Sequence, residues 1–329
     1  MDDLWKRMVC AMALSILLPQ LAVGIGSRFV EAPGSPPETV LPDVPTQETV
    51  YLPQAILYIP VLGKDGIARV MELEDYIRGV ILAEMPASFE IDALKAQAVA
   101  ARTYTLRRLL KGDRHTQGVI CTNSKCCQAW ISDGDYLKGM GVQKDIDKIR
   151  SAVAATAGQV LTYAGEVAES TYFSCSGGST EDAAAVWGAD IPYLQARPSP
   201  GEEGFSEYEK QVYFTKKEFA GALGRSLWGT PEDWLGQVRY TPGGGVDTML
   251  IGGITYSGVE LRKLLDLRST IFTMEADEKG ITVTTLGNGH RVGMSQNGAE
   301  AMAVLGKDYR QILAYYYPGT KIDKISELG

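Results

Sequence analysis

Cysteine and histidine are concentrated in one short segment of the chain. The stretch HTQGVICTNSKCCQAW contains one of the two histidines and three of the five cysteines. Structural zinc sites take four Cys or His ligands, although their ligand pairs usually follow a Cys-x2–4-Cys spacing. The alternative is a disulfide of Cys121 with Cys127 or Cys175, in a compartment that permits disulfides. We expect a single tetrahedral zinc site, formed by His115, Cys121, Cys126 and Cys127.

One glutamate has the position of a general acid. Glu84, in ILAEMP, lies in the last turn of an expected helix, on or beside its apolar stripe. The partial negative charge at a helix C-terminus disfavours a carboxylate and raises its pKa. A carboxyl group that keeps its proton near neutral pH can protonate a glycosidic oxygen. The alternative is a structural carboxylate at a helix end, paired with Arg102.

Two loops rich in glycine and small polar residues are candidates for ligand binding. In STYFSCSGGST, residues 170–180, paired glycines allow close approach of a ligand and hydroxyl groups can bind sugar oxygens, although an ordinary turn has the same composition. GHRVGMSQNGAEAMA, residues 289–303, places His290 on a loop and Ser295 at a helix N-cap. A serine nucleophile is not expected, because only His290 would be free to act as its base.

The helices that must position these residues are readable from the spacing of apolar side chains. Leu73, Tyr76, Ile77, Val80 and Ile81 predict an amphipathic helix that ends before a proline. The alanine-rich stretch that follows, EIDALKAQAVAARTYTLRRLLK, has apolar residues on two faces, which indicates a central helix buried on most sides. It also carries Arg102 on a small-residue face, where a buried arginine needs an acidic partner or a bound anion.

Strands are expected on either side of these helices. Turn residues around Lys64–Gly66 predict a hairpin before the first helix, and a third helix should end at Gly158. Near the C-terminus, strands are expected over 270–276 and 280–286. The fold class is therefore α+β, with mixed helices and antiparallel strands that form a substrate groove and a smaller inserted subdomain at 197–270.

The composition also bounds the domain organisation. Lys6 and Arg7 precede an apolar run, so residues 1–29 are expected to be an uncleaved membrane anchor rather than a signal peptide. Residues 30–54 are rich in Pro and Glu and read as an extended tether, followed by a catalytic domain at 55–329. A net charge of -8 argues against a nucleic-acid partner.

Three blocks of the sequence resemble one family. EMPASFEIDALKAQAVAARTY, YFSCSGGSTE and GHRVGMSQNGAEAMA are similar to the blocks of the stage II sporulation protein D family, which is related to amidase-enhancer proteins. The resemblance covers about residues 51–320, and some clostridial members are similar in having a Cys/His zinc site beside the active site. The chain departs from the family pattern at Arg291, where glycine is usual, at Asn297, where tyrosine is usual, and at Cys175, a position often small and polar.

The resemblance implies a membrane-anchored lytic transglycosylase of peptidoglycan that acts during forespore engulfment, between mother cell and forespore. It would cleave the bond between N-acetylmuramic acid and N-acetylglucosamine in peptide-stripped strands and leave 1,6-anhydro ends. The implied partners are stage II sporulation proteins P and M. A non-catalytic glycan-binding enhancer of an amidase and a zinc-dependent hydrolase are the alternatives.

The resemblance also assigns roles to residues. Glu84 would be the essential acid, and Arg102 would orient it or tune its pKa. No cofactor would be needed for the chemistry, so a zinc ion would be structural, because four protein ligands leave no position for water. The substrate groove would be lined by Ser174, Ser176, Gly177, Gly178, Thr180, His290, Ser295 and Gln296.

Overall fold

The computed structural model describes residues 57–112, 115, 118–139 and 141–328, and its mixed helices and sheets confirm the α+β fold class. The expected membrane anchor at 1–29 and tether at 30–54 lie outside the described residues. Among the residues that are described, no helix has the length and apolar character needed to cross a membrane.

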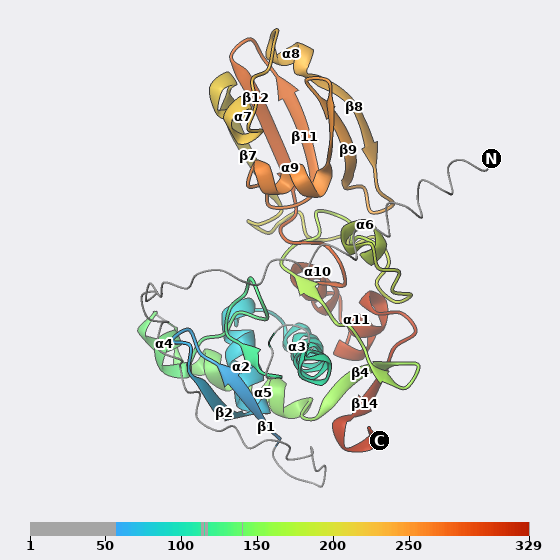
Figure 1. The fold of residues 1–329 in the computed structure, drawn as a ribbon. Coiled ribbons are helices and arrows are strands. Elements are labelled where there is room, and N and C mark those ends of the chain that lie inside the picture. Colours follow the sequence, from blue (N-terminus) through green and yellow to red (C-terminus); the bar gives the residue numbers. More distant parts are fainter. Residues whose placement is uncertain (1–56, 113–114, 116–117, 140, 329) are drawn as a thin grey trace, which may run out of the picture. The chain divides into compact units, whose positions relative to one another are not determined.

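The described residues outside 209–286 form a first region around one central helix (Figure 1). Its helices are α2 (Leu73–Glu84), α3 (Ile91–Lys111), α4 (Asp133–Lys138), α5 (Gln143–Ala155), α6 (Ala183–Trp187), α10 (Gln296–Val304), α11 (Tyr309–Tyr316) and a final 3-10 turn (Ile325–Glu327). Its strands are β1 (Tyr58–Leu62), β2 (Ala68–Glu72), β3 (Ile120–Cys121), β4 (Gln159–Tyr163), β5 (Glu166–Val167), β6 (Tyr172–Phe173), β13 (Met294–Ser295) and β14 (Lys321–Lys324).

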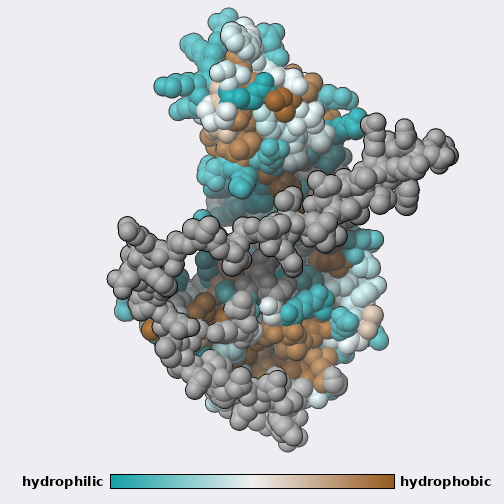
Figure 2. Space-filling view, viewed as in Figure 1, coloured by the Kyte–Doolittle hydropathy of each residue, from teal (hydrophilic) through white to brown (hydrophobic). Residues whose placement is uncertain are grey.

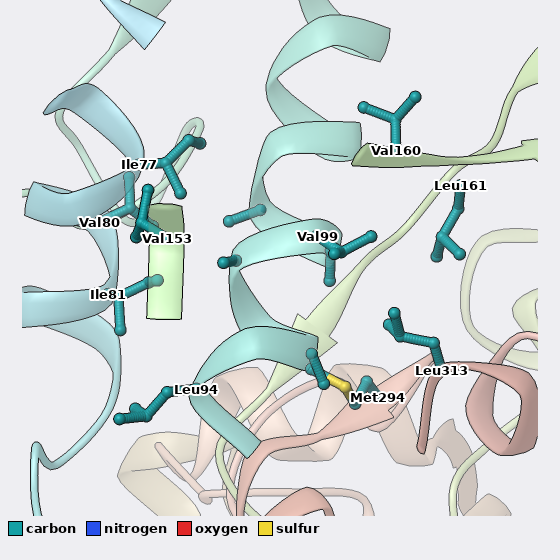
Figure 3. Close-up of a cluster of buried hydrophobic side chains, with 14 of the residues drawn as sticks. Ile77, Val80, Ile81, Leu94, Val99, Val153, Val160, Leu161, Met294 and Leu313 are labelled. Atoms are coloured by element: carbon teal, nitrogen blue, oxygen red, sulfur yellow. The ribbon is translucent and has the colours of Figure 1, made fainter. Parts of the chain in front are cut away.

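The central helix is α3, as its two apolar faces predict. It contacts α2, α5, α10, α11 and β4, and its alanines are buried, since small side chains allow neighbouring elements to approach closely. Figure 3 shows Leu94 and Val99 of α3 between Ile77, Val80 and Ile81 of α2 on one side and Val160, Leu161 and Leu313 on the other. The helix ends at Gly112, a C-cap in the left-handed conformation.

Short sheets surround this helical core. β1 pairs with β2 in the expected antiparallel hairpin and with β3 in parallel. β4 lies between β5 and β14, and β6 pairs in parallel with β13. This last pair brings together the two candidate ligand-binding segments. β6 leads into residues 174–180, here called the Ser/Gly-rich loop, and β13 lies in the segment 289–303, directly before α10.

Residues 209–286, here called the β7–β12 region, have a hydrophobic core of their own. Two three-stranded antiparallel sheets, β11-β12-β7 and β10-β9-β8, enclose it with short helices (Figure 1). Hydrophilic residues make up much of the outline that this region presents in Figure 2. Its elements are β7 (Glu209–Thr215), α7 (Lys216–Ala222), α8 (Pro231–Trp234), β8 (Leu235–Tyr240), β9 (Val246–Ile251), β10 (Ile254–Ser257), α9 (Gly258–Leu264), β11 (Ile271–Ala276) and β12 (Gly280–Leu286).

The chain enters and leaves the β7–β12 region at one place. Gly287 donates a backbone hydrogen bond of 2.7 Å to the carbonyl of Tyr208, and Glu209 is the register partner of Leu286. The subdomain expected at 197–270 stops short of β11 and β12, although both strands were expected from the sequence. β12 is the middle strand of its sheet and supplies Ile281 and Val283 to this core, so the core cannot be formed without it.

Candidate functional site

Glu84 ends helix α2 beside a segment from the Cys/His stretch. The helix stops at Met85, whose extended backbone fits its position before Pro86. Glu84 is partly exposed; its Oε1 accepts a hydrogen bond of 2.9 Å from the backbone N–H of Ala129, and its Oε2 a longer one of 3.4 Å from Nε2 of Gln296. The carboxyl group is therefore held from two sides by segments distant in sequence.

Burial raises the pKa of Glu84 above its ordinary value. The hydrogen bonds from Ala129 and Gln296 favour the charged form and oppose this shift, but removal of the carboxylate from water outweighs them. The direction matches what a general acid needs, and the main cause is burial.

Glu84 lines a pocket of about 500 Å³. Two other predicted residues, Ser174 and His290, line the same pocket. Gln296 is not part of this lining, but its side chain donates a hydrogen bond to Glu84, which is. The remaining lining mixes aromatic, amide and charged side chains with backbone that a polar ligand can use. It consists of Tyr104, Arg108, Ser124, Lys125, Cys126, Cys127, Gln128, Glu169, Thr171, Tyr172, Phe173, Trp187, Ile191, Asn288 and Gly289.

His290 is a neutral member of this pocket. Its ring lies 5.6 Å from the ring of Phe173 and 5.3 Å from that of Trp187, and its Nδ1 accepts the backbone N–H of Val292 at 3.1 Å. Burial, followed by the charge of Arg262, lowers its pKa to about 4. A neutral imidazole whose Nδ1 accepts a hydrogen bond can donate from Nε2.

The other predicted binding residues lie outside the lining of this pocket as the structure describes it. Ser176 is buried, and its hydroxyl and backbone N–H bind Glu202. Thr180 exchanges hydrogen bonds with the backbone of Arg197, and Ser295 caps α10 by accepting from the N–H of Gly298, as expected. The glycines Gly177 and Gly178 belong to the same loop and have positive φ.

Gly177 shows why this loop needs glycine. A Cβ at this position would come within 2.7–2.9 Å of the backbone of Leu286 and Gly287. The loop therefore packs directly against the exit of the β7–β12 region. Ser176, Gly177, Gly178 and Thr180 therefore shape the loop that carries Ser174. The family resemblance predicts instead that they line the substrate groove themselves.

Arg102 is fully buried, as its sequence position predicts, but its partner is Glu74. Its Nε and Nη2 bind that carboxylate at 2.9 and 2.6 Å, and its Nη1 donates to the carbonyl of Gln159 at 3.0 Å. Glu74 lies in the first turn of α2 and Glu84 at its end, about 15 Å apart at the rise of an α-helix. The structure thus does not bring Arg102 to Glu84; the arginine joins α2, α3 and β4.

Arg291, a departure from the family pattern, also has a structural explanation. Its φ is +68°, in the left-handed region that favours glycine, and its side chain is fully buried. It donates to the carbonyls of Ser176, Ser179 and Gly243 and lies 3.5 Å from Oε2 of Glu181. Gly243 belongs to the β8–β9 turn, so the side chain ties the Ser/Gly-rich loop to the β7–β12 region.

The four residues of the Cys/His cluster come together. Their ligand atoms all lie within 4.8 Å of one another, with His115 Nε2 at 3.5 Å from the sulfurs of both Cys126 and Cys127, and those sulfurs 3.9 Å apart. A tetrahedral zinc has bonds of about 2.3 Å to sulfur and 2.0–2.1 Å to nitrogen. It therefore requires a nitrogen–sulfur separation of roughly 3.5 Å and a sulfur–sulfur separation of roughly 3.8 Å. The donor set fits zinc. The described cysteines, Cys175 included, form no disulfide in the structure.

Sequence reasoning missed several residues of the pocket wall. Tyr104 and Arg108 are four residues apart on α3 and so share a face, with the guanidinium carbon 4.7 Å from the ring centroid. Arg108 also pairs with Glu169, which precedes the Ser/Gly-rich loop. The i, i+4 spacing was a readable signal for the first pair. Nothing local in the sequence points to Glu169 or Trp187.

The comparisons with known proteins identify the family of the chain. The model of the SpoIID family, described as stage II sporulation protein, matches residues 63–163, which include Glu84 and the Cys/His cluster. The chain is 40% identical over 257 residues to stage II sporulation protein D of Bacillus subtilis, covering 77% of this chain and 74% of that protein. The protein of the same name from Bacillus amyloliquefaciens is 39% identical over the same shares.

A more distant relative carries a different name. The amidase enhancer of Bacillus subtilis is 28% identical over 299 residues, which cover 75% of this chain and 40% of that protein. The identity and coverage are greater for the sporulation proteins. The chain belongs to the stage II sporulation protein D family.

Proposed function

We propose that the protein is a peptidoglycan lytic transglycosylase of sporulation, with Glu84 as its acid. The observation that carries the proposal is a carboxyl group whose pKa is raised by burial, at the wall of a pocket of about 500 Å³. The other carboxyl group of this pocket, Glu169, is in an ion pair with Arg108 and is not needed as a second catalyst. A single acid suffices where the attacking group belongs to the substrate.

In the proposed reaction Glu84 first donates a proton and then takes one back. Glu84 gives its proton to the oxygen that links N-acetylmuramic acid to N-acetylglucosamine, and the bond from C1 to that oxygen breaks. The C6 hydroxyl of the same muramic acid attacks C1 and returns its proton to Glu84. No water is consumed, the product has a 1,6-anhydro end, and the intramolecular attack supplies much of the rate. Two-carboxylate hydrolases need a second group for water or for a covalent bond.

Other pocket residues would hold the sugar for this step. The hydrogen bond of Gln296 to Glu84 orients the carboxyl group, and the N–H of Ala129 fixes its other oxygen. His290, neutral and partly exposed in the pocket, would not act as a base, and its ring is held by the backbone of Tyr172 and Val292. The ring of Trp187, which is 44% exposed, offers a flat apolar face for the sugar ring.

Replacement of Glu84 by glutamine tests the assignment. Glutamine keeps the size of the side chain but has no proton to give, so we expect formation of anhydro-ended fragments from peptide-stripped glycan to fall by about 10²–10⁴-fold, the usual contribution of a general acid. Mass spectrometry of the products measures this. Glu278→Gln, in the exposed turn between β11 and β12, is the matched control. Undiminished cleavage by Glu84→Gln would reject the role of Glu84.

The amidase-enhancer alternative rests on the relative of that name. An enhancer that only binds glycan would release no fragments from pure strands, whether or not Glu84 is intact. The same mass-spectrometric assay, run without any amidase, separates the two functions. Fragments with anhydro ends support the lytic enzyme, and intact strands support the enhancer.

We also propose that His115, Cys121, Cys126 and Cys127 hold a zinc ion with a structural role. Support comes from the fit of their distances to a tetrahedral site. Four protein ligands leave no open position, which argues against a zinc-dependent hydrolase. The ion would fix the segment from Cys126 to Ala129, whose last backbone N–H holds Glu84.

The cellular setting completes the proposal and rests on the family resemblance. We propose that the N-terminal segment anchors the protein in the cell membrane, with the catalytic domain on the outer face between mother cell and forespore. Its substrate would be glycan stripped by stage II sporulation protein P, in a complex held by protein M. Trypsin added to intact cells should degrade the catalytic domain, and a protected domain would contradict this orientation.

A further inference from the structure

The pocket of Glu84 contains a lysine, Lys125, for which the structure describes no ion pair. Its wall has two acidic side chains, Glu84 and Glu169, and two basic ones, Arg108 and Lys125. Arg108 and Glu169 form an ion pair whose partners are both largely buried. Burial favours the neutral form of Glu84, and no acidic side chain among the described residues forms an ion pair with Lys125. Lys125 is therefore the basic side chain of this pocket for which the structure describes no ion pair.

Lys125 has a fixed base and an exposed side chain. Its backbone N–H donates to Asn123 Oδ1 at 2.9 Å, and the next two residues belong to the Cys/His cluster. Lys125 therefore lies on a held segment in the wall of the same pocket as Glu84. Arg108 is held over the ring of Tyr104 by a cation–π contact of 4.7 Å.

Peptide removal changes the charge of muramic acid. In an intact strand, the lactyl group of each N-acetylmuramic acid is joined to the peptide by a neutral amide. An amidase hydrolyses that amide and leaves a free carboxylate, so a stripped strand carries one negative charge per disaccharide. The protein itself has a net charge of -8 and repels such a strand at long range. Attraction must therefore come from local cations at the site.

We propose that Lys125 binds the free lactyl carboxylate of muramic acid and thereby selects peptide-stripped glycan. This inference rests on the proposed function, because it assigns the specificity of the same pocket. An ammonium group forms a charge-assisted hydrogen bond with a carboxylate but gains little from a neutral amide. Lys125 is thus a specificity residue, distinct from the acid.

The test compares a substrate that has the charged lactyl carboxylate with one that has a small neutral amide in its place. Peptide-stripped strands of defined length are used as the free acid and, after coupling to methylamine, as the neutral methylamide. Wild-type protein should cleave the free acid with a kcat/KM about fivefold higher, the value of about 1 kcal/mol at an exposed ion pair. Lys125→Met should bring the ratio close to one, whereas Lys125→Arg should preserve it. Lys144→Met, an exposed lysine on α5, is the matched control and should keep the wild-type ratio.

Binding separates this inference from the proposed function. The Glu84→Gln variant should bind the free acid about fivefold more tightly than the methylamide in calorimetry, and the added Lys125→Met should remove that difference. If no cleavage occurs but this binding difference is present, the function fails and the carboxylate site stands. If cleavage occurs with equal kcat/KM for both substrates, or if Lys125→Met keeps the preference, the carboxylate site is overturned and the function stands.

Discussion

The protonation of Glu84 is set by a competition between burial and two hydrogen bonds. Burial favours the acid, and the donors from Ala129 and Gln296 favour the carboxylate. Because burial prevails, the folded-state pKa lies above that of the unfolded chain. The protonated acid contributes stability that is present below the unfolded pKa and is lost as the pH rises through the folded pKa.

The pH dependence of activity should follow the same sign. A general acid works only while it holds its proton, so kcat/KM should be constant at lower pH and fall as the pH rises through the raised pKa of Glu84. His290, with a pKa of about 4, is neutral at the pH values where Glu84 loses its proton, so it does not contribute to this fall in rate, here called the alkaline limb of the pH–rate profile. The measurement is a pH–rate profile on stripped glycan. A profile that rises with pH over this range would show that a base, not an acid, limits the reaction.

A substitution at Gln296 should shift the pH at which the activity falls. Its hydrogen bond to Glu84 lowers the pKa of the carboxyl group, so Gln296→Leu should shift the alkaline limb to higher pH. Asn297→Leu, which also lies on α10, is a matched control because Asn297 has no hydrogen bond to Glu84 among those the structure describes. If Gln296→Leu lowers the rate at every pH without moving the limb, Gln296 acts on the substrate and not on Glu84.

At the scale of elements, the pair of Arg102 and Glu74 holds α2 against α3. Glu74 also accepts the backbone N–H of Gly158 at 3.0 Å, so the same carboxylate joins the end of α5 to the pair. Glu74→Gln leaves a fully buried guanidinium without its counter-charge and should lower the free energy of unfolding by about 3 kcal/mol. Urea denaturation measures the loss.

The same variant distinguishes a structural from a catalytic role of Arg102. With Arg102 bound to Glu74, the folded Glu74→Gln protein should keep the alkaline limb of the wild type at low temperature. Asp147→Asn, a carboxylate on α5 with about half of its side chain exposed, provides the control for a surface ion pair and should cost less than 1 kcal/mol. A shifted limb in Glu74→Gln would show that Arg102 tunes Glu84 after all.

Arg291 has a strained backbone conformation, but its buried side chain stabilises the surrounding loops through hydrogen bonds and an ion pair. Replacement by glycine, the residue that the family resemblance implies at this position, relieves a left-handed conformation worth roughly 1–2 kcal/mol. It also leaves Glu181 buried without its cation, at a cost of about 3–5 kcal/mol. The loss is larger, so Arg291→Gly should destabilise the protein, with faster hydrogen exchange at 176–181 and 243–245. A gain in stability would show that strain is the larger effect.

The helices could be predicted from sequence, and their long-range partners could not. Apolar spacing fixes α2 and α3, and Pro86 fixes where α2 ends, because these signals act within one element. The partner of Arg102 depends on how two helices cross, which no local pattern specifies. The same limit explains why Glu84 and the Cys/His cluster were found while the pocket wall at Glu169 was missed: Glu169 reaches Arg108 only through tertiary packing.

For the whole molecule, the Cys/His cluster links the fold to the acid. Removal of the proposed zinc with a chelator should lower the melting temperature and loosen the segment up to Ala129, because metal binding at such a site contributes folding free energy. Glu84 then loses the N–H that holds Oε1, so activity should fall in parallel with protection of this segment from hydrogen exchange. Cys126→Ser should reproduce the loss, whereas Cys175→Ser, outside the cluster, should retain one zinc per chain by elemental analysis. If chelation abolishes cleavage while segment protection and melting temperature stay unchanged, the metal is catalytic and the structural role is refuted.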